Sequence, residues 1–207
     1  MKKDNVLDKN GSYTFSDYFK MKVSIEDIAD FFGYKIDREE LVFKKTEFVK
    51  SDEMDVFKND IKQLYKFIDF SNEASRREFL IAPVLFQLVK FSNKPIRIHL
   101  EEDISVNDLL KGTLDYYIES ENKIVIVEAK NVDLVNGMKQ LAVELIAMDH
   151  FEDRKTNPFL YGAVSIGEDW RFARLDREKK RITEDIKLYR VPEETEILLS
   201  VLMNLLD

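Results

Sequence analysis

The chain contains no cysteine and only two histidines among its 207 residues. Without cysteine there is no disulfide framework, no thiolate metal site and no cysteine nucleophile. His99 and His150 are too few for a typical histidine-ligated zinc site. Cysteine-dependent chemistry is therefore excluded, and zinc chemistry is disfavoured.

Long apolar runs are also missing. No stretch approaches the ~18 residues that a membrane-spanning helix needs. Residues 1–5 lead into polar sequence and not into the apolar region of a signal peptide. Since 44% of the residues are hydrophobic and 12% aromatic, the composition indicates a packed globular protein. We therefore expect a cytoplasmic protein that does not contact membranes.

The chain also lacks an excess of basic residues. The formal net charge is −8, whereas a protein that grips nucleic acid usually carries a basic surface. A nucleic-acid partner would require that Lys and Arg gather on one face or that a metal screens an acidic site.

The first 70 residues have a helical pattern. Ser24 is a good N-cap for a helix over 25–32, and Gly33 is a typical stop. A second helix is expected from Ser51, with apolar residues three and four apart that form one stripe: Met54, Phe57, Ile61, Leu64 and Ile68. The stripe either packs against the rest of the chain or forms the seam of a homodimer.

The remainder mixes helices and strands. A helix is expected from Asn72 to Phe91, and the strand over 123–128 is apolar on both faces, which is typical of a central strand covered on both sides. Further strands are expected over 95–106, 112–119, 160–166, 170–175 and 182–191, and further helices over 133–151 and from Pro192 onward, with a hairpin turn at 167–169. The order predicts an α/β sandwich with a mixed central sheet.

The hairpin between the strands over 112–119 and 123–128 brings two acids together. If the turn is centred between Glu121 and Asn122, Asp115 lies directly opposite Glu128. Opposed Cβ atoms are about 4.5–5.5 Å apart, and like charges at that distance repel. A divalent cation removes the conflict, because Mg²⁺ takes carboxylate oxygens, waters and phosphate oxygens as ligands.

Lys130 follows two residues after Glu128 and therefore points to the same face of the strand. Ala129 points away and offers its backbone carbonyl. A metal pair beside an ammonium group meets the needs of phosphodiester hydrolysis, in which a water is activated and phosphate charge is stabilised. The alternative is an ion network of Asp115, Glu128 and Lys130 at the end of a sheet.

These residues resemble a known family. The segments 112–115 (GTLD) and 126–130 (IVEAK), set between two helices, look like the signature of PD-(D/E)xK nucleases, which are restriction-endonuclease-like enzymes. The resemblance extends over about 72–190 and is closest to nuclease domains of type I restriction subunits and their relatives. Leu114 stands where the family has the proline of its name, but the acid carries the chemistry.

The resemblance implies a three-layer restriction-endonuclease-like core over 71–207, preceded by an accessory or dimerisation segment over 1–70. It implies a Mg²⁺ or Mn²⁺ ion held by Asp115, Glu128 and the Ala129 carbonyl, with Lys130 as the catalytic cation. Glu78 shares a helix face with apolar residues and is expected at the metal, with an arginine ion pair as the alternative. Glu73 is expected to act on the helix dipole, although it could take the role of Glu78.

Gln140 and Glu144 lie four apart on the following helix. The resemblance implies that Gln140 sits beside Lys130 as part of the catalytic group, whereas a solvated helix face is the alternative for both residues. Candidate phosphate contacts, which could equally be solvated charges, are Arg76, Arg77, Arg171, Arg174 and the run 177–181.

The function expected from this resemblance is metal-dependent hydrolysis of nucleic acid, with DNA as the substrate and endonuclease action. Two active sites related by a twofold axis could then cut both strands. The alternative is a module that keeps the nuclease fold without cutting, as a binding or assembly subunit of a defence or repair system.

Overall fold

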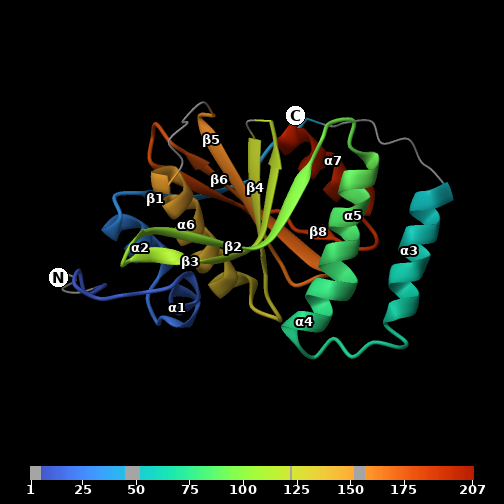
Figure 1. Cartoon of the computed structure of the whole chain (residues 1–207), viewed down its shortest axis with the longest axis horizontal. Coiled ribbons are helices and arrows are strands. Elements are labelled where there is room, and N and C mark those ends of the chain that lie inside the picture. Colours follow the sequence, from blue (N-terminus) through green and yellow to red (C-terminus); the bar gives the residue numbers. More distant parts are fainter. Residues whose placement is uncertain (1–5, 45–51, 122, 152–156) are drawn as a thin grey trace.

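The computed structural model describes residues 6–44, 52–121, 123–151 and 157–207 and shows an α/β architecture (Figure 1). Its strands form one mixed sheet in the order β1-β7-β6-β5-β4-β3-β2, with β8 paired to β6. The strands are β1 (Lys35–Glu39), β2 (Arg97–Asn107), β3 (Leu110–Ser120), β4 (Lys123–Ala129), β5 (Phe159–Ser165), β6 (Asp169–Asp176), β7 (Arg181–Asp185) and β8 (Tyr189–Arg190). The helices are α1 (Phe15–Lys20), α2 (Ile25–Phe31), α3 (Asp52–Leu64), α4 (Glu73–Arg76), the π-helical turn η1 (Arg77–Ile81), α5 (Ala82–Phe91), α6 (Leu134–Phe151) and α7 (Thr195–Leu206).

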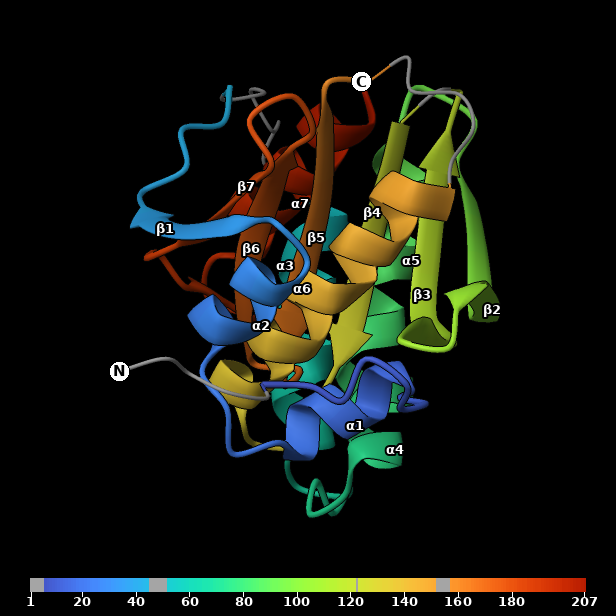
Figure 2. The same ribbon diagram turned by 90° about the vertical axis from the view of Figure 1, so that its left-hand side faces the viewer.

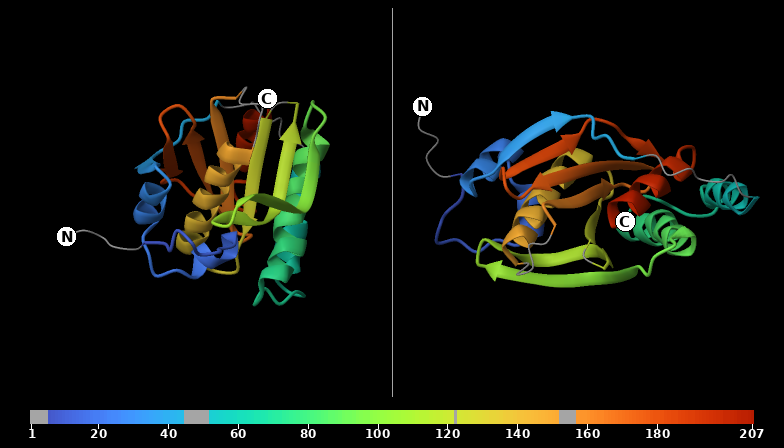
Figure 3. Two further views of the ribbon diagram at one scale, coloured as in Figure 1. Left: turned by 60° about the vertical axis from the view of Figure 1, so that its left-hand side comes forward. Right: turned by 90° about the horizontal axis from the view of Figure 1, so that it is seen from above.

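The sheet is covered on both faces, which confirms the predicted sandwich with a mixed sheet. On one face α3, η1, α5 and α7 enclose a core that includes Val125 and Val127 of β4. On the other face α1, α2 and α6 enclose a second core that includes Ile124 and Ile126. Figure 2 looks onto the α6 side with α5 and α7 behind the sheet, and Figure 3 shows the layers from above. The alternation of β4 residues between the two cores explains why this strand is apolar throughout.

The β3–β4 hairpin has the register that the sequence predicts. Tyr116 pairs with Val127 and Ser120 pairs with Lys123. Continuing this ladder by one step sets Asp115 against Glu128. β4 pairs in parallel with β5, and α6 makes the connection between them.

The helix expected over 72–91 forms with one irregularity. Its N-terminus is capped by Asn72, whose side chain accepts a hydrogen bond from the Ser75 amide at 2.8 Å. The π-helical turn η1 then interrupts the α-helical hydrogen bonding between α4 and α5. Such a turn inserts extra backbone and shifts the helix face presented by the residues after it.

The described residues among the first 70 contribute to both layers and to the sheet. α1 and α2 pack against α6, and β1 extends the sheet through parallel pairing with β7. A strand lies where only helix was expected. On α3, Met54, Phe57 and Ile61 are buried in the core with α5 and α7, so the apolar stripe packs within the chain, as the first of its two interpretations states. Residue 51, where this helix was expected to begin, lies outside the described residues.

The C-terminal part differs from the sequence prediction in one respect. The single strand expected over 182–191 is divided into β7 and β8, which pair with β6 at different places. The hairpin turn between β5 and β6 forms as expected, with Gly167 at a φ of 95°. No helix in the described part of the chain is long and apolar enough to cross a membrane.

Candidate active site

The predicted acids meet at the carboxyl end of β4. In Figure 2 this end of the strand points down toward α1 and α4. Asp115 Oδ2 accepts a hydrogen bond of 2.9 Å from the Ala129 amide. The Asp115 side chain is thereby fixed to the backbone between Glu128 and Lys130. The structure thus brings together the four residues predicted for the centre: Asp115, Glu128, Ala129 and Lys130.

Glu128 lies in a hydrogen-bonded group between β4 and α6. Its Oε1 accepts from the ammonium group of Lys130 and from Gln140 Nε2, the latter at 2.6 Å. Glu128 is 1% exposed and Lys130 is 8% exposed. Burial opposes the charged ammonium, but the Glu128 carboxylate outweighs it, so the pKa of Lys130 is raised. Lys130 therefore stays a cation within the protein.

Gln140 also connects Glu128 to a second buried acid. Its Nε2 donates to Glu144 Oε1 at 2.9 Å. Glu144 is fully buried. Burial raises the pKa of Glu144 to about 7 and raises that of Glu128 as well. Gln140 and Glu144 thus lie inside the protein and not on a solvated helix face, because they face Glu128 between α6 and β4.

Asp115 has a cation of its own. Arg77 of η1 lies 3.3 Å from Asp115 Oδ1 and 3.2 Å from Glu101 Oε1. Its guanidinium also stands 5.7 Å from the centre of the Tyr116 ring. Asp115 and Glu128 are therefore each paired with a cation, Arg77 and Lys130. Among the described candidate phosphate contacts, Arg77 lies directly against a predicted site residue.

The two acids of the helix before β2 lie in different surroundings. Glu78 is exposed, and its charge acts on the Tyr116 hydroxyl, whose pKa is raised chiefly by burial. The charge of Glu73, one turn earlier, contributes to the raised pKa of Lys130. The charge of Glu73 thus reaches Lys130, whereas the metal role expected of Glu78, or of Glu73 in its place, stays a prediction.

The other candidate arginines are engaged within the protein. Arg76 donates to Asn131 Oδ1 at 3.0 Å and to the Ile166 carbonyl at 2.7 Å, and it pairs with Glu168. Arg171 pairs with Glu184 at 3.1 Å. Arg76 therefore joins α4 to the loops that follow β4 and β5, which is a structural role.

The residues present fit a hard divalent cation in part. Asp115 and Glu128 supply carboxylates with the Ala129 backbone between them, and Glu128 Oε2 is buried without a partner among the described residues. Oxygen ligands of this kind suit Mg²⁺ and Mn²⁺. Within the ranges that the structure describes, however, no group of three His, Asp or Glu side chains could hold a metal. Waters and a substrate phosphate would have to complete the shell.

One neighbour of the site gave no signal in the sequence. The ring of Phe19 on α1 lies over Lys130, with 5.4 Å between the ring centre and Nζ. Phe19 is 111 positions before Lys130, and neither residue lies in a motif that indicates the contact. The contact follows from the packing of α1 against α6.

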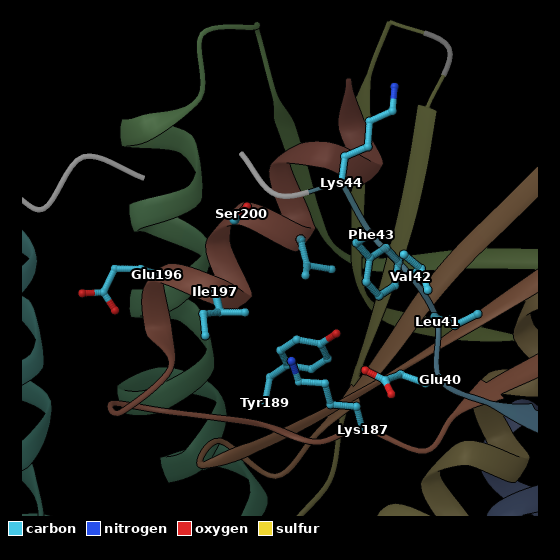
Figure 4. Close-up of a pocket in the computed structure, with 11 residues that line it drawn as sticks. Glu40, Leu41, Val42, Phe43, Lys44, Lys187, Tyr189, Glu196, Ile197 and Ser200 are labelled. Atoms are coloured by element: carbon cyan, nitrogen blue, oxygen red, sulfur yellow. The ribbon is translucent and has the colours of Figure 1, made fainter. Parts of the chain in front are cut away.

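The hollow in Figure 4 lies elsewhere on the molecule. It has a volume of about 460 Å³ and is lined by residues of α7, of the β7–β8 region and of the segment 40–44. Tyr189 and Lys187 both line it, and Lys187 Nζ lies 4.6 Å from the centre of the Tyr189 ring. Asp115, Glu128 and Lys130 do not line it. The candidate active site at the end of β4 is therefore separate from this hollow.

Comparison with protein-family models and with curated proteins gives no match for this chain. The assignment of the site accordingly rests on its own geometry.

Proposed function

We propose that the protein is a Mg²⁺- or Mn²⁺-dependent nuclease of the PD-(D/E)xK type with a restriction-endonuclease-like core. The observation that carries this proposal is the arrangement of Asp115, Glu128 and Lys130 around the Ala129 amide. Two acids approach each other at a sheet end, and a buried lysine is bonded to one of them. Glu128 and Lys130, which the sequence spacing singled out, are thus in contact.

Each residue has a distinct role in this function. Asp115, Glu128 and the Ala129 carbonyl would hold the metal, which when bound lowers the pKa of a coordinated water and polarises a phosphoryl oxygen. Lys130 offers a fixed positive charge to the phosphate as negative charge builds on its oxygens. Gln140 fixes the Glu128 carboxylate through the 2.6 Å hydrogen bond. Arg77, beside Asp115, stands where it can contact the same phosphate.

A cleavage panel tests the proposal. Linear duplex, circular duplex and single-stranded DNA, with an RNA of the same sequence, are incubated with Mg²⁺ or Mn²⁺. Wild-type protein is expected to cut at least one of them, and Asp115→Asn to cut it about 100-fold more slowly, or slower still. Asp108→Asn, which changes an exposed acid in the β2–β3 turn, is the matched control and should cut normally. Cleavage by Asp115→Asn at the wild-type rate would refute the proposal.

A non-cleaving binding or assembly subunit is the second candidate. The observation in its favour is that each acid already has a basic partner, Asp115 in Arg77 and Glu128 in Lys130. Such a network is stable without metal. Calorimetric titration with Mn²⁺ separates the two functions, because the nuclease should bind the ion and Glu128→Gln should weaken that binding. Equal heats for the two proteins, with no saturable binding, would favour the second candidate.

A further inference from the structure

Phe19 differs from the aromatic residues around it. Its neighbours in α1, Phe15 and Tyr18, are 1% and 0% exposed. Phe19 is only partly buried, and among the described residues it joins neither of the two hydrophobic cores. Its ring lies instead over the ammonium of Lys130. An aromatic side chain is thus placed at the reactive group and not in the interior.

The segment that carries Phe19 is firmly anchored. A capping box between Thr14 and Asp17 starts α1. The Tyr18 hydroxyl donates to the Leu109 carbonyl at 2.6 Å, and Lys139 of α6 donates to the Met21 carbonyl at 2.6 Å. These bonds join α1 to the β2–β3 turn and to α6. Phe19 is therefore held beside Lys130 by the fold.

The reactive groups beside it are recessed. Glu128 and Lys130 are 1% and 8% exposed, and the centre of the Phe19 ring lies 5.4 Å from Lys130 Nζ, so a phosphodiester held at Lys130 lies close to this ring. The base next to that phosphate then comes within reach of the ring. Bases in a duplex are already stacked and paired, so an aromatic side chain can stack only on a base that is unpaired.

The charge of the molecule points in the same direction. A net charge of −8 disfavours a long duplex held by many phosphate contacts, since each contact requires a cation on the protein. Stacking on one or two bases gives affinity without such contacts. Lys20 and Lys22, both exposed next to Phe19 in the chain, provide local positive charge for a short stretch of backbone.

We infer that Phe19 is a substrate-contacting, specificity-determining residue that stacks on an unpaired base next to the scissile phosphate. The substrate class is then single-stranded or frayed nucleic acid. This inference rests on the proposed nuclease function and names the substrate that its site accepts.

The test compares one labelled 20-nucleotide DNA as a single strand and as a duplex. Wild type should show a higher kcat/KM on the single strand. Phe19→Ala should lower this value about 5- to 150-fold, mainly through KM, and change duplex cleavage less than twofold. Phe19→Trp should restore single-strand cleavage, whereas Phe19→Leu should not. Phe86→Ala, which changes a 65% exposed ring of α5 on the other face, is the control and should change neither rate.

Binding measured without cleavage separates this inference from the proposed function. Fluorescence anisotropy with the labelled single strand in EDTA should show weaker binding for Phe19→Ala than for wild type. If that difference is found but no metal supports cleavage, the nuclease proposal fails, and only the stacking of Phe19 on an unpaired base stands. If cleavage occurs and Phe19→Ala matches wild type, or lowers single-strand and duplex rates equally, the stacking role is refuted. If wild type neither cuts nor binds the single strand, both fail.

Discussion

Three buried oxygen atoms between β4 and α6 lack donors among the described residues: Glu128 Oε2, Glu144 Oε2 and Gln140 Oε1. Buried acceptors without donors are costly. A proton held by the two carboxyl groups reduces this cost, because a protonated carboxyl is itself a donor. Burial of the same two carboxyl groups raises the pKa values of Glu128 and Glu144, which favours the bound proton.

A pH-dependent stability follows for Glu144. Its pKa rises from the usual 4.5 to about 7 in the folded protein, so the folded state binds this proton more tightly than the unfolded state. The resulting stability is present below pH 4.5 and is lost as the pH rises through 7. In metal-free buffer, wild type should lose about 3 kcal/mol more unfolding free energy between pH 4.5 and 8 than Glu144→Gln, whose amide does not titrate. Urea denaturation at both pH values measures this, and equal losses would contradict it.

Part of the site could be predicted residue by residue. Strand alternation and hairpin register are local rules, and they placed Asp115, Glu128 and Lys130 correctly relative to one another. The partners Arg77 and Phe19 could not be predicted, since they depend on how separate elements pack. The different surroundings of Glu73 and Glu78 could not be predicted either, because the π-helical turn that separates Glu73 from α5 gives no clear sequence signal.

At the level of elements, the approach of α6 to the sheet determines where Lys130 lies. Gly137 permits this approach, because a Cβ at this position would come within 2.6 Å of Val164 Cγ1 and 3.0 Å of Lys130 Cγ. A glycine within a helix costs about 1 kcal/mol relative to alanine. The structure identifies the two side chains that require it.

Gly137→Ala should therefore destabilise the protein although alanine favours helix. Steric overlap with Val164 and Lys130 should lower the unfolding free energy by about 1–3 kcal/mol and displace the Lys130 side chain. Val135→Ala on the same helix, at a 71% exposed position, is the control and should change stability by less than about 0.5 kcal/mol. Chemical denaturation checks both variants, and a Gly137→Ala protein as stable as wild type would show that the contact is not tight.

Elements with a strong local sequence pattern were predicted well, whereas elements that form only through pairing with distant residues were not. β4 and α6 have long apolar patterns that their burial on both sides explains. β1 is short and charged, and it becomes a strand only through pairing with β7, whose residues lie 146 positions further along the chain. No local rule reports such a partner.

For the whole molecule, the described residues among the first 70 are part of the folded body. They supply residues to both hydrophobic cores, among them Phe15, Tyr18, Met54 and Ile61. Each buried side chain of this size contributes about 1.5–3 kcal/mol, while a domain is stable by only about 5–15 kcal/mol. The apolar stripe of α3 packs within the chain and is not free to form a homodimer seam. A homodimer through another surface stays a prediction.

Removing residues 1–70 should therefore abolish cooperative folding. A chain of residues 71–207 would expose α6 and the α5–α7 core to water. We expect circular dichroism to show no sharp thermal transition for this truncated chain, whereas the full chain melts cooperatively. A truncated protein that melts within about 5 °C of the full chain would show that the N-terminal part is an independent appendage.

The most direct test of the central claim is the rate of metal-dependent cleavage by Lys130→Ala. If Asp115, Glu128 and Lys130 form the reactive centre, this rate should fall about 100-fold or more. Lys123→Ala, at the opposite end of the same strand, should cut normally. Circular dichroism and Lys130→Gln control for loss of fold. A folded Lys130→Ala protein that cuts as fast as Lys123→Ala and wild type would contradict the account.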